Sequence, residues 1–406
     1  MPWTERGTQR EIEPRLPVKW SIKKNMSKIK TAVIGAGFMG RVHTEGIRRL
    51  GNVEVAAVAA ISAEEAASFG KAMGIEKTTG DYREILADPS IQAVHICAPN
   101  ALHHKISMEA MQAGKHVLCE KPLALTSAEA NEMAATARKN GLANCVNHNL
   151  RYYPLMQHVR RMIEGGELGE ILIVQGTYSQ DWLLYDTDFN WRVESRDNGA
   201  LRAMGDIGSH WMDMIQHLTG QKISSVCADL VIFHKTRKKP KIAVETFAGK
   251  QLRPEDYEEV AIDTDDFGSV MLRLGERAHG AFTVSQMSAG CKNRFQVEIF
   301  GTKSGVIWNQ EEPNTLWIGQ RNSPNLTLLK DPSLLNPKAA AFADLPGGHA
   351  EGYGDTHKQV YKRFYRKVAD PSAPVEYPTF EEGAWGMHLL EKVRESARKR
   401  AWVDTL

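Results

Sequence analysis

The sequence lacks several features that would assign it to a broad class of protein. It has no run of about 18 apolar residues, the length that a membrane-spanning helix needs. Its five cysteines, Cys97, Cys119, Cys145, Cys227 and Cys291, are widely spaced and include no Cys-x-x-Cys, which argues against a disulfide framework and a zinc ribbon. The 51 basic and 49 acidic residues leave a formal charge of +2. Because that charge gives no overall attraction to nucleic acid or anionic lipid, a small-molecule partner is expected.

The composition predicts a globular protein of two domains. Apolar residues make up 42% and charged residues 25% of the chain, values typical of a folded globular protein. Its 406 residues exceed the length at which one hydrophobic core usually stops growing. Residues 1–27 are charged, contain three prolines and show no period, which indicates an N-terminal extension or poorly ordered arm. They also lack the continuous apolar core of a secretion signal, so we expect a cytoplasmic protein.

Residues 28–148 alternate short apolar runs with amphipathic segments, as in an α/β protein. The strand-like runs are "KTAVIG", "VEVAAVAA", "IQAVHICA", "KHVLCE" and "LANCVNH". The helical stretches are Met39–Leu50, Ala63–Met73, Leu102–Ala113 and Ser127–Lys139. This spacing predicts a doubly wound parallel sheet of the Rossmann type, covered on both faces by helices.

Residues 149–406 follow a different pattern, which predicts an α+β domain with a largely antiparallel open sheet. Runs such as "DFGSVMLRL", "GAFTVSQMS" and "FQVEIFG" succeed one another through short turns. Helices are expected over Leu155–Glu164, Asp206–Leu218, Gly354–Lys367 and Phe380–Lys399. The basic stretch that begins "HKTRKKPK" is expected to be a solvated hairpin or loop.

The stretch "TAVIGAGFMGRVH" carries a dinucleotide-binding signal. Gly35, Gly37 and Gly40 form G-x-G-x-x-G directly after a strand and at the start of a helix. The first glycine suits a tight turn, the second lets the backbone approach a pyrophosphate, and the third allows close packing of helix on strand. Together with the intervening Phe38 and Met39, they predict the cofactor phosphates at the helix N-terminus.

The end of the second strand leaves the choice of dinucleotide open. An Asp or Glu about 20 residues after the glycines would hold the adenosine ribose, but the sequence has Ala59, Ala60, Ile61 and Ser62 there. No arginine stands at that place to receive a 2′-phosphate. We therefore expect NAD, with Ser62 near the ribose, and keep NADP as the alternative.

Two further motifs follow strands of the same sheet. "APNALHH" supplies Pro99, Asn100 and His103, and "CEKPLAL" supplies Glu120 and Lys121. Because ligands bind outside the carboxyl ends of the strands in an open α/β sheet, we expect all five residues on the cofactor side.

The stretch "GDIGSHWMD" places Asp206 and His210 four residues apart. On a helix, Ile207, Trp211, Met214, Ile215 and Leu218 fall on one apolar stripe, and the two polar residues fall beside it. The spacing by itself is compatible with two metal ligands, an acid/base pair or a solvated helix start.

Taken in order, G-x-G-x-x-G, "APN", "EKP", "NHNLRYYP" and "GDIGSHWMD" resemble the Gfo/Idh/MocA oxidoreductase family. The resemblance covers residues 29–406, and "SQDWLLYDTDFNWR" and "PGGHAEGYGDTHKQVYKRFY" are most similar to levoglucosan dehydrogenases and related pyranoside dehydrogenases. It implies a catalytic trio of Lys121, Asp206 and His210. It also implies oxidation of a pyranose ring hydroxyl at C3, and a homodimer or homotetramer formed through the C-terminal sheet.

The chemistry of these side chains suggests a division of labour. His210 is expected to be the general base, Lys121 to stabilise the substrate oxygen, and Asp206 to orient the sugar and His210; Lys121 is the alternative base. Further candidates for sugar contact are Arg151, Tyr152, Gln180, Trp191, Arg192 and His349.

Three other functions compete with a dehydrogenase. A metal enzyme would use Asp206 and His210 as ligands, although the sequence offers no compact third ligand and we expect no metal. A sugar or NAD sensor would keep the fold without the chemistry. A glycoside-cleaving enzyme would oxidise its substrate only transiently.

Overall fold

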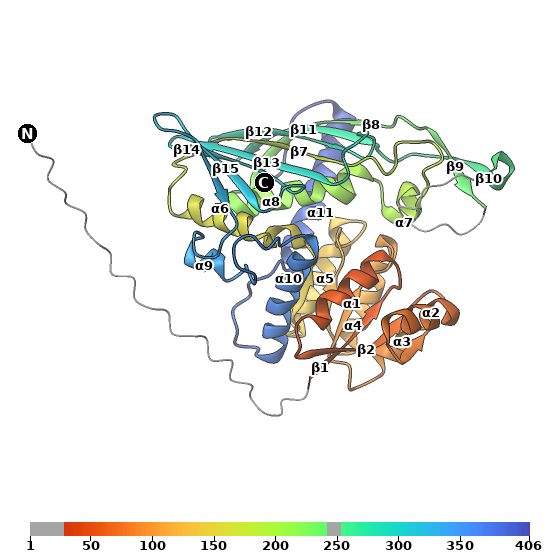
Figure 1. The fold of residues 1–406 in the computed structure, drawn as a ribbon. Helices are drawn as coiled ribbons and strands as arrows, with labels where there is room; N and C mark the ends of the chain where they lie inside the picture. Colours follow the sequence, from red (N-terminus) through yellow and green to blue (C-terminus); the bar gives the residue numbers. More distant parts are fainter. Residues whose placement is uncertain (1–27, 242–252) are drawn as a thin grey trace, which may run out of the picture.

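The computed structural model describes residues 28–241 and 253–406. The predicted N-terminal extension therefore lies outside the described residues. The described chain forms two large sheets and one two-stranded ribbon, with helices around the large sheets (Figure 1).

The smaller sheet is the predicted Rossmann sheet, with strand order β3-β2-β1-β4-β5-β6 and every pair parallel. Its strands are β1 (Ile29–Ile34), β2 (Val53–Ala59), β3 (Lys77–Thr79), β4 (Ala93–Ile96), β5 (His116–Cys119) and β6 (Asn144–Val146). The chain turns to opposite sides after β1 and β4, which are neighbours. Their carboxyl ends are therefore the switch point at which such sheets bind ligands.

Helices cross over between these strands close to the predicted positions. They are α1 (Phe38–Arg48), α2 (Ala63–Met73), α3 (Tyr82–Leu86), the 3₁₀ turn η1 (Asn100–Leu102), α4 (His103–Gln112) and α5 (Ser127–Lys139). The predicted bounds of α2 and α5 are confirmed, because each begins after a hydroxyl N-cap, Ser62 or Thr126. The short β3 and α3 were not predicted, since segments of three and five residues carry too few apolar positions to show a period.

The larger sheet has nine strands in the order β16-β15-β14-β13-β7-β12-β11-β8-β17. They are β7 (Ile171–Ser179), β8 (Ile223–Val231), β11 (Phe267–Leu274), β12 (Ala278–Ser285), β13 (Arg294–Gly301), β14 (Ser304–Asn309), β15 (Thr315–Gln320), β16 (Leu326–Leu329) and β17 (Val403–Asp404). All neighbouring pairs are antiparallel except β7 and β12, so the prediction of a largely antiparallel sheet is confirmed. The basic stretch forms a separate antiparallel ribbon of β9 (Thr236–Pro240) and β10 (Tyr257–Ala261). This pairing agrees with the predicted hairpin over the residues that the structure describes.

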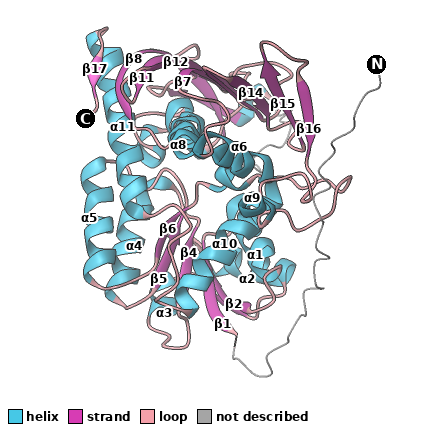
Figure 2. Cartoon of the chain, turned by 90° about the vertical axis from the view of Figure 1, so that its left-hand side faces the viewer, coloured by secondary structure: helices cyan, strands magenta, loops and turns pink. Residues whose placement is uncertain are grey.

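Helices α6 (Pro154–Glu164) and α8 (Ser209–Thr219) lie beneath the larger sheet, on the side that faces the smaller one (Figure 2). Trp211 anchors α8 there, because its ring stacks on Phe282 at 4.3 Å and its Nε1 donates to the carbonyl oxygen of Gln296. The predicted apolar stripe of this helix is buried along its whole length.

The last helices return to the Rossmann unit. Helix α10 (Tyr353–Ala369) packs on α1 and on the 3₁₀ turn η2 (Asn149–Tyr152), and α11 (Phe380–Lys399) packs on α5 and β8. Between the sheets and these helices lie the short η3 (Trp191–Val193), α7 (Ser195–Asn198) and α9 (Pro337–Ala340). The predicted domains, residues 28–148 and 149–406, each contain one of the two large sheets. Helix α10 belongs by sequence to the second domain but packs on α1 of the first, so we keep this division as a proposal.

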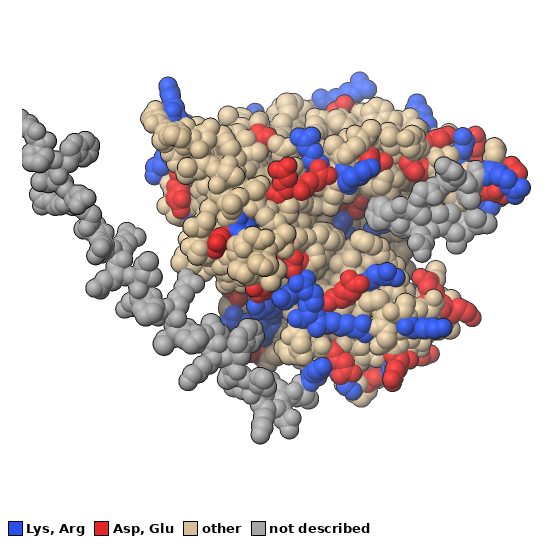
Figure 3. All heavy atoms as spheres, viewed as in Figure 1, with Lys and Arg blue, Asp and Glu red and all other residues tan. Residues whose placement is uncertain are grey.

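The described surface carries both signs of charge. Acidic and basic side chains are interspersed over both layers in the view of Figure 3. In residues 28–241 and 253–406, no helix is long and apolar enough to cross a membrane.

Candidate active site

The glycine-rich turn joins β1 to α1 at the switch point. Gly35 has φ +115°, and a Cβ there would lie 2.5 Å from the carbonyl oxygen of Cys97, so both conformation and space require glycine. Gly40 packs equally closely, since its Cβ would lie 2.1 Å from the carbonyl oxygen of Gly35. A Cβ on Gly37 would meet no atom within 4 Å. The turn is thus closed toward the protein at two glycines and open at the one expected to approach a pyrophosphate.

The N-terminus of α1 is suited to an anion. In the described structure no side chain caps it, and no acidic residue lies in its first turn. Phe38 there is 52% exposed, and Met39 receives a long hydrogen bond from the Tyr353 hydroxyl, 3.8 Å from its sulfur. The N-terminus of α1 therefore suits the phosphates of a dinucleotide, because the helix dipole and the free backbone N–H groups favour negative charge there.

The end of β2 carries no acid, as the sequence indicates. Ile61 is exposed, and the hydroxyl of Ser62 accepts a hydrogen bond from the backbone N–H of Glu65 at 3.2 Å. Ser62 is therefore the N-cap of α2, a local role that leaves its predicted ribose contact untested.

The "APN" loop after β4 is fixed by buried hydrogen bonds. The Asn100 amide donates to the carbonyl and side-chain oxygens of Asn198, at 2.9 and 3.1 Å. The two ring nitrogens of His103 lie 2.9 Å from the carbonyl oxygens of Ala98 and Pro122, and the ring is fully buried. His103 thus joins this loop to the "EKP" turn and presents no unoccupied ring nitrogen to a cofactor.

Glu120 of "EKP" belongs to a buried network below the turn. Its Oε1 lies 2.8 Å from His43 Nε2 and 2.5 Å from the Asn147 amide nitrogen. His43 Nδ1 lies 2.8 Å from His95 Nδ1, and His95 Nε2 lies 2.8 Å from the Tyr365 hydroxyl. Burial holds the pKa of His95 well below its usual value, so this ring is neutral. A carboxylate can only accept, so His43 Nε2 donates to Glu120, and the neutral His95 ring links His43 to the Tyr365 hydroxyl.

Lys121 and Asp206 form the central pair of the site. Lys121 Nζ donates to Asp206 Oδ1 and to the Asp206 carbonyl oxygen, both at 2.8 Å. The two side chains are only 13% and 12% exposed. Burial raises the pKa of Asp206, but the charges of Lys121 and Arg192 outweigh it and hold this pKa below its usual value. A charged donor and a carboxylate therefore stand fixed at the switch point.

Asp206 lies on a π-helical turn, Met204–Gly208, which continues into α8. The predicted helix is confirmed, but its first turn is wider than an α-helix, a local feature that often marks functional sites. His210 lies on the following α-helical turn and is 6% exposed, with Nδ1 buried and unpartnered among the described residues. Burial and the charge of Lys121 hold the pKa of His210 well below its usual value, so its imidazole is neutral near pH 7.

Two more side chains reach Asp206. Gln286 Nε2 donates to Oδ2 at 2.9 Å, and Arg192 Nε lies 3.6 Å from Oδ1. Arg192 also stacks on Trp191, with its guanidinium carbon 4.4 Å from the ring centroid. The structure thus brings Trp191 and Arg192, both predicted to contact the sugar, to the edge of the site.

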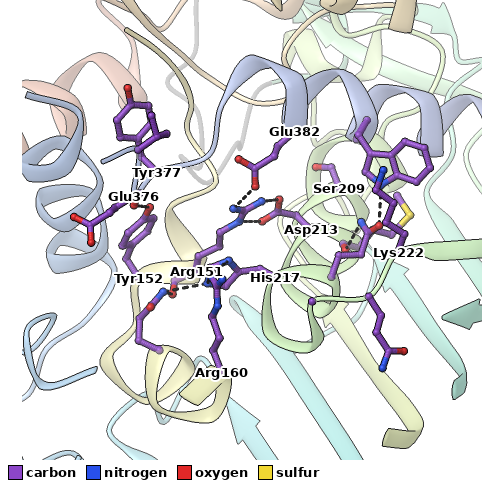
Figure 4. Close-up of a pocket in the computed structure, with 18 of the residues that line it drawn as sticks. Arg151, Tyr152, Arg160, Ser209, Asp213, His217, Lys222, Glu376, Tyr377 and Glu382 are labelled. Carbon is purple, nitrogen blue, oxygen red and sulfur yellow. Dashed lines mark hydrogen bonds and ion pairs between the residues drawn. The ribbon is translucent and has the colours of Figure 1, made fainter. Parts of the chain in front are cut away.

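The other predicted sugar-contact residues lie elsewhere or are already engaged. Gln180 bonds Trp182 and Asn293, and His349 is exposed in its loop. Arg151 and Tyr152 line a separate cavity of about 470 Å³ farther along α8, which none of Lys121, Asp206 and His210 lines (Figure 4).

In that cavity Arg151 is held between two carboxylates. Its guanidinium donates to Asp213 at 2.8 and 2.5 Å and to Glu382 at 2.7 Å. The Tyr152 hydroxyl donates to the backbone oxygen of Glu376 at 2.7 Å. Sequence reasoning placed both residues near the cleft because they follow the Rossmann unit, but their partners come from α8 and the C-terminal segment.

Sequence reasoning also missed side chains that contact the site. Gln286 lies within the predicted strand run "GAFTVSQMS", and His43 lies one turn beyond the glycine motif, but neither forms part of a motif with a known spacing. Their partners are 80 and 77 residues away in the chain, so only the fold reveals the contacts.

The Rossmann sheet, its glycine-rich turn and the Lys121–Asp206 pair together indicate a dinucleotide-binding oxidoreductase. Residues 29–148 match the description "Oxidoreductase family, NAD-binding Rossmann fold", and residues 156–307 match the "GFO/IDH/MocA C-terminal domain". The chain belongs to the Gfo/Idh/MocA oxidoreductase family, as its motifs predict.

Individual relatives agree over nearly the whole chain. A levoglucosan dehydrogenase of Pseudarthrobacter phenanthrenivorans is 29% identical over 393 residues, 93% of this chain and 98% of the relative. A structure of levoglucosan dehydrogenase with NADH and L-sorbose superposes with a TM-score of 0.84 at 28% identity, over 94% of this chain and 100% of that one. An inositol dehydrogenase homolog of Azotobacter vinelandii, with NAD+, gives 0.82 at 25% identity, over 94% and 98%.

Proposed function

We propose that this protein is an NAD-dependent sugar dehydrogenase that oxidises a secondary ring hydroxyl. The expected substrate is a pyranose such as levoglucosan or a glucoside, and the expected position is C3. Support comes from the family membership and from relatives named for levoglucosan and inositol, both cyclic polyols.

The observation that carries the proposal is the Lys121–Asp206 pair at the carboxyl ends of the Rossmann strands. The 2.8 Å contact brings together two motifs 85 residues apart, and His210 lies one turn beyond Asp206 on the same helix. Alcohol oxidation needs a proton acceptor, a group that stabilises negative charge on oxygen, and fixed geometry. Each requirement has a matching side chain in this group.

The proposed roles follow from charge and hydrogen bonding. The bound nicotinamide supplies the hydride acceptor. His210, neutral near pH 7, takes the hydroxyl proton. Lys121 donates to the substrate oxygen as negative charge develops, and Asp206 orients Lys121 and a neighbouring hydroxyl. Lys121 Nζ already donates to Asp206 twice, whereas His210 Nδ1 has no partner among the described residues, which is why His210 is the preferred base.

A spectrophotometric screen tests the proposal directly. Levoglucosan, glucose, simple glucosides and inositols are offered with NAD or NADP, and the product is identified by NMR. We expect net NADH formation with an intact glycoside and a new carbonyl at C3. Release of the aglycone without net NADH would instead indicate the glycoside-cleaving alternative.

Three variants assign the roles. Lys121→Met, Asp206→Asn and His210→Ala are expected to lower kcat by about 10²–10⁴-fold, the range for removal of a positioned acid/base or electrostatic group. NADH binding and melting temperature control for the fold. Nearly normal turnover in His210→Ala would remove His210 as the principal base.

Two broader properties stay predictions. A homodimer or homotetramer through the nine-stranded sheet rests on the family resemblance, and a cytoplasmic location rests on the sequence. Sedimentation of the full chain and fractionation of expressing cells test them separately.

A further inference from the structure

Gln286, directly after β12, holds one oxygen of Asp206 in a defined way. Its side chain is fully buried; Nε2 donates to Asp206 Oδ2 at 2.9 Å, and Oε1 accepts from Arg202 at 3.1 Å. A guanidinium can only donate, so the Gln286 oxygen must face Arg202 and its NH₂ must face Asp206. Arg202 thereby prevents the amide from turning over.

A buried carboxylate joins Arg202 to a second arginine. Asp266 Oδ1 accepts from both Arg202 and Arg237, the latter at 2.8 Å, and all three side chains are fully buried. Its other oxygen accepts from the backbone N–H groups of Phe233 and His234, at 2.7 and 3.0 Å. Burial lowers the pKa of Arg202 to about 9 and that of Arg237 to about 10, so both remain cationic at neutral pH.

Arg237 in turn fixes the segment that leads to Arg192. It donates to the backbone oxygens of Leu183, Tyr185 and Asp188, at 3.0, 2.9 and 2.9 Å. These carbonyls lie in the loop between β7 and η3, and η3 carries Trp191 and Arg192 to the edge of the site. A continuous set of buried bonds therefore links the substrate-side loop to Asp206.

The neighbouring Asp265 fixes the backbone of the same region. Its two carboxylate oxygens accept from the backbone N–H groups of Arg202 and Met204, at 2.7 and 2.8 Å. Met204 is the first residue of the π-helical turn that carries Asp206. Two neighbouring aspartates thus act on Asp206. Asp266 acts on its side chain through Arg202 and Gln286, and Asp265 acts on the backbone that leads to it.

We propose that Gln286 is a positioning residue for Asp206, and that Arg202, Asp266 and Arg237 orient Gln286 and keep the 183–188 loop in register with Asp206. This inference rests on the proposed function, in which Asp206 contacts the sugar. With Oδ1 held by Lys121 and Oδ2 by Gln286, Asp206 stays ionised in one rotamer, because hydrogen bonds to a carboxylate favour its charged form.

The main test is Gln286→Leu, with Gln359→Leu as a matched control. Gln359 is also fully buried between an arginine and an aspartate, accepting from Arg363 at 2.9 Å and donating to Asp344 at 2.9 Å, but on α10. We expect Gln286→Leu to lower kcat/KM for the sugar about 10–100-fold, as for a small misplacement of a reacting group. The acid limb of the kcat/KM pH profile should also move to higher pH in Gln286→Leu, because Asp206 loses a hydrogen bond that favours its ionised form. Gln359→Leu should lower only the melting temperature.

The outcome that overturns the positioning role is specific. If Gln286→Leu retains kcat/KM and its pH profile within twofold of wild type while Asp206→Asn does not, Gln286 does not position Asp206. Should Gln286→Leu fail to fold, Gln286→Asn decides by the same criteria, because its amide is one methylene too short to reach both partners.

A separate variant tests the link between Arg237 and the 183–188 loop. Arg237→Lys keeps the charge but loses the fork that serves three carbonyls, so we expect the KM for the sugar to rise more than kcat falls. Unchanged KM and kcat in a folded Arg237→Lys would overturn the link to the loop.

A crystal structure of Gln286→Leu separates this inference from the proposed function. If the wild type oxidises no sugar, the proposed function fails, but the position of Asp206 can still be measured. We expect the Asp206 carboxylate to turn away and its contact with Lys121 Nζ to lengthen beyond 3.5 Å. An unchanged 2.8 Å contact in Gln286→Leu would contradict the positioning role.

Discussion

His43 Nε2 lies 2.8 Å from Glu120 Oε1, and this buried bond joins the glycine-rich helix to the turn that carries Lys121. The cofactor end and the chemical end of the site are therefore connected beneath the surface. Burial raises the pKa of Glu120, but the hydrogen bond from His43 and the charge of Lys121 outweigh it and hold that pKa below its usual value.

The first prediction concerns this bond. His43→Leu leaves a buried carboxylate short of a donor, so we expect a loss of roughly 3 kcal/mol in unfolding free energy, measured by urea denaturation. Glu120→Gln should cost less, because the amide oxygen still accepts from His43. Equal losses in the two variants would show that the bond itself contributes little.

The second prediction is the pH dependence of sugar oxidation. A base must be unprotonated, so activity is lost as pH falls through the folded-state pKa of His210. Because burial and Lys121 lower this pKa from 6.5, we expect the acid limb of kcat/KM to lie below pH 6.5. His217→Gln, which alters another histidine of α8, should leave the limb in place. An acid limb above pH 8 would reassign the base to Lys121.

The third prediction separates cofactor binding from folding at two glycines. Gly37→Ala adds a methyl group to open space, so the melting temperature should stay near wild type, while the Kd for NADH rises about tenfold or more, at 1.4 kcal/mol per factor of ten. Gly40→Ala forces a Cβ to within 2.1 Å of the Gly35 carbonyl and should cost about 1–3 kcal/mol of stability. Unchanged NADH affinity in Gly37→Ala would place the pyrophosphate elsewhere.

The fourth prediction concerns cofactor preference. The end of β2 lacks an acid, and Ala60→Asp supplies one where a ribose hydroxyl is expected. We expect the ratio of kcat/KM for NAD over NADP to rise about tenfold, since the carboxylate binds the hydroxyl and repels a 2′-phosphate. Ala67→Asp, on the exposed side of α2, adds the same charge as a control and should leave the ratio unchanged.

The fold class and the chemical motifs could be predicted from the amino-acid sequence. Period and spacing predicted the Rossmann strands and helices, and the glycine motif marked the turn that the structure shows to be closed at Gly35 and Gly40. These features are local, because steric limits on φ and the helical repeat act over a few residues. For the same reason, the apolar stripe of α8 was predicted in full.

Which polar side chains contact one another became visible only in the folded chain. Arg151 and Arg192 were equal candidates in the sequence, but Arg151 pairs with Asp213 and Glu382, whereas Arg192 reaches Asp206. The role of Gln286 depends on Arg202 and Asp206, 84 and 80 residues away. The neutral state of His210 likewise follows from burial beside Lys121, which no spacing encodes. Hydrogen bonding and desolvation depend on three-dimensional neighbours, and those are set when the sheets, helices and loops pack.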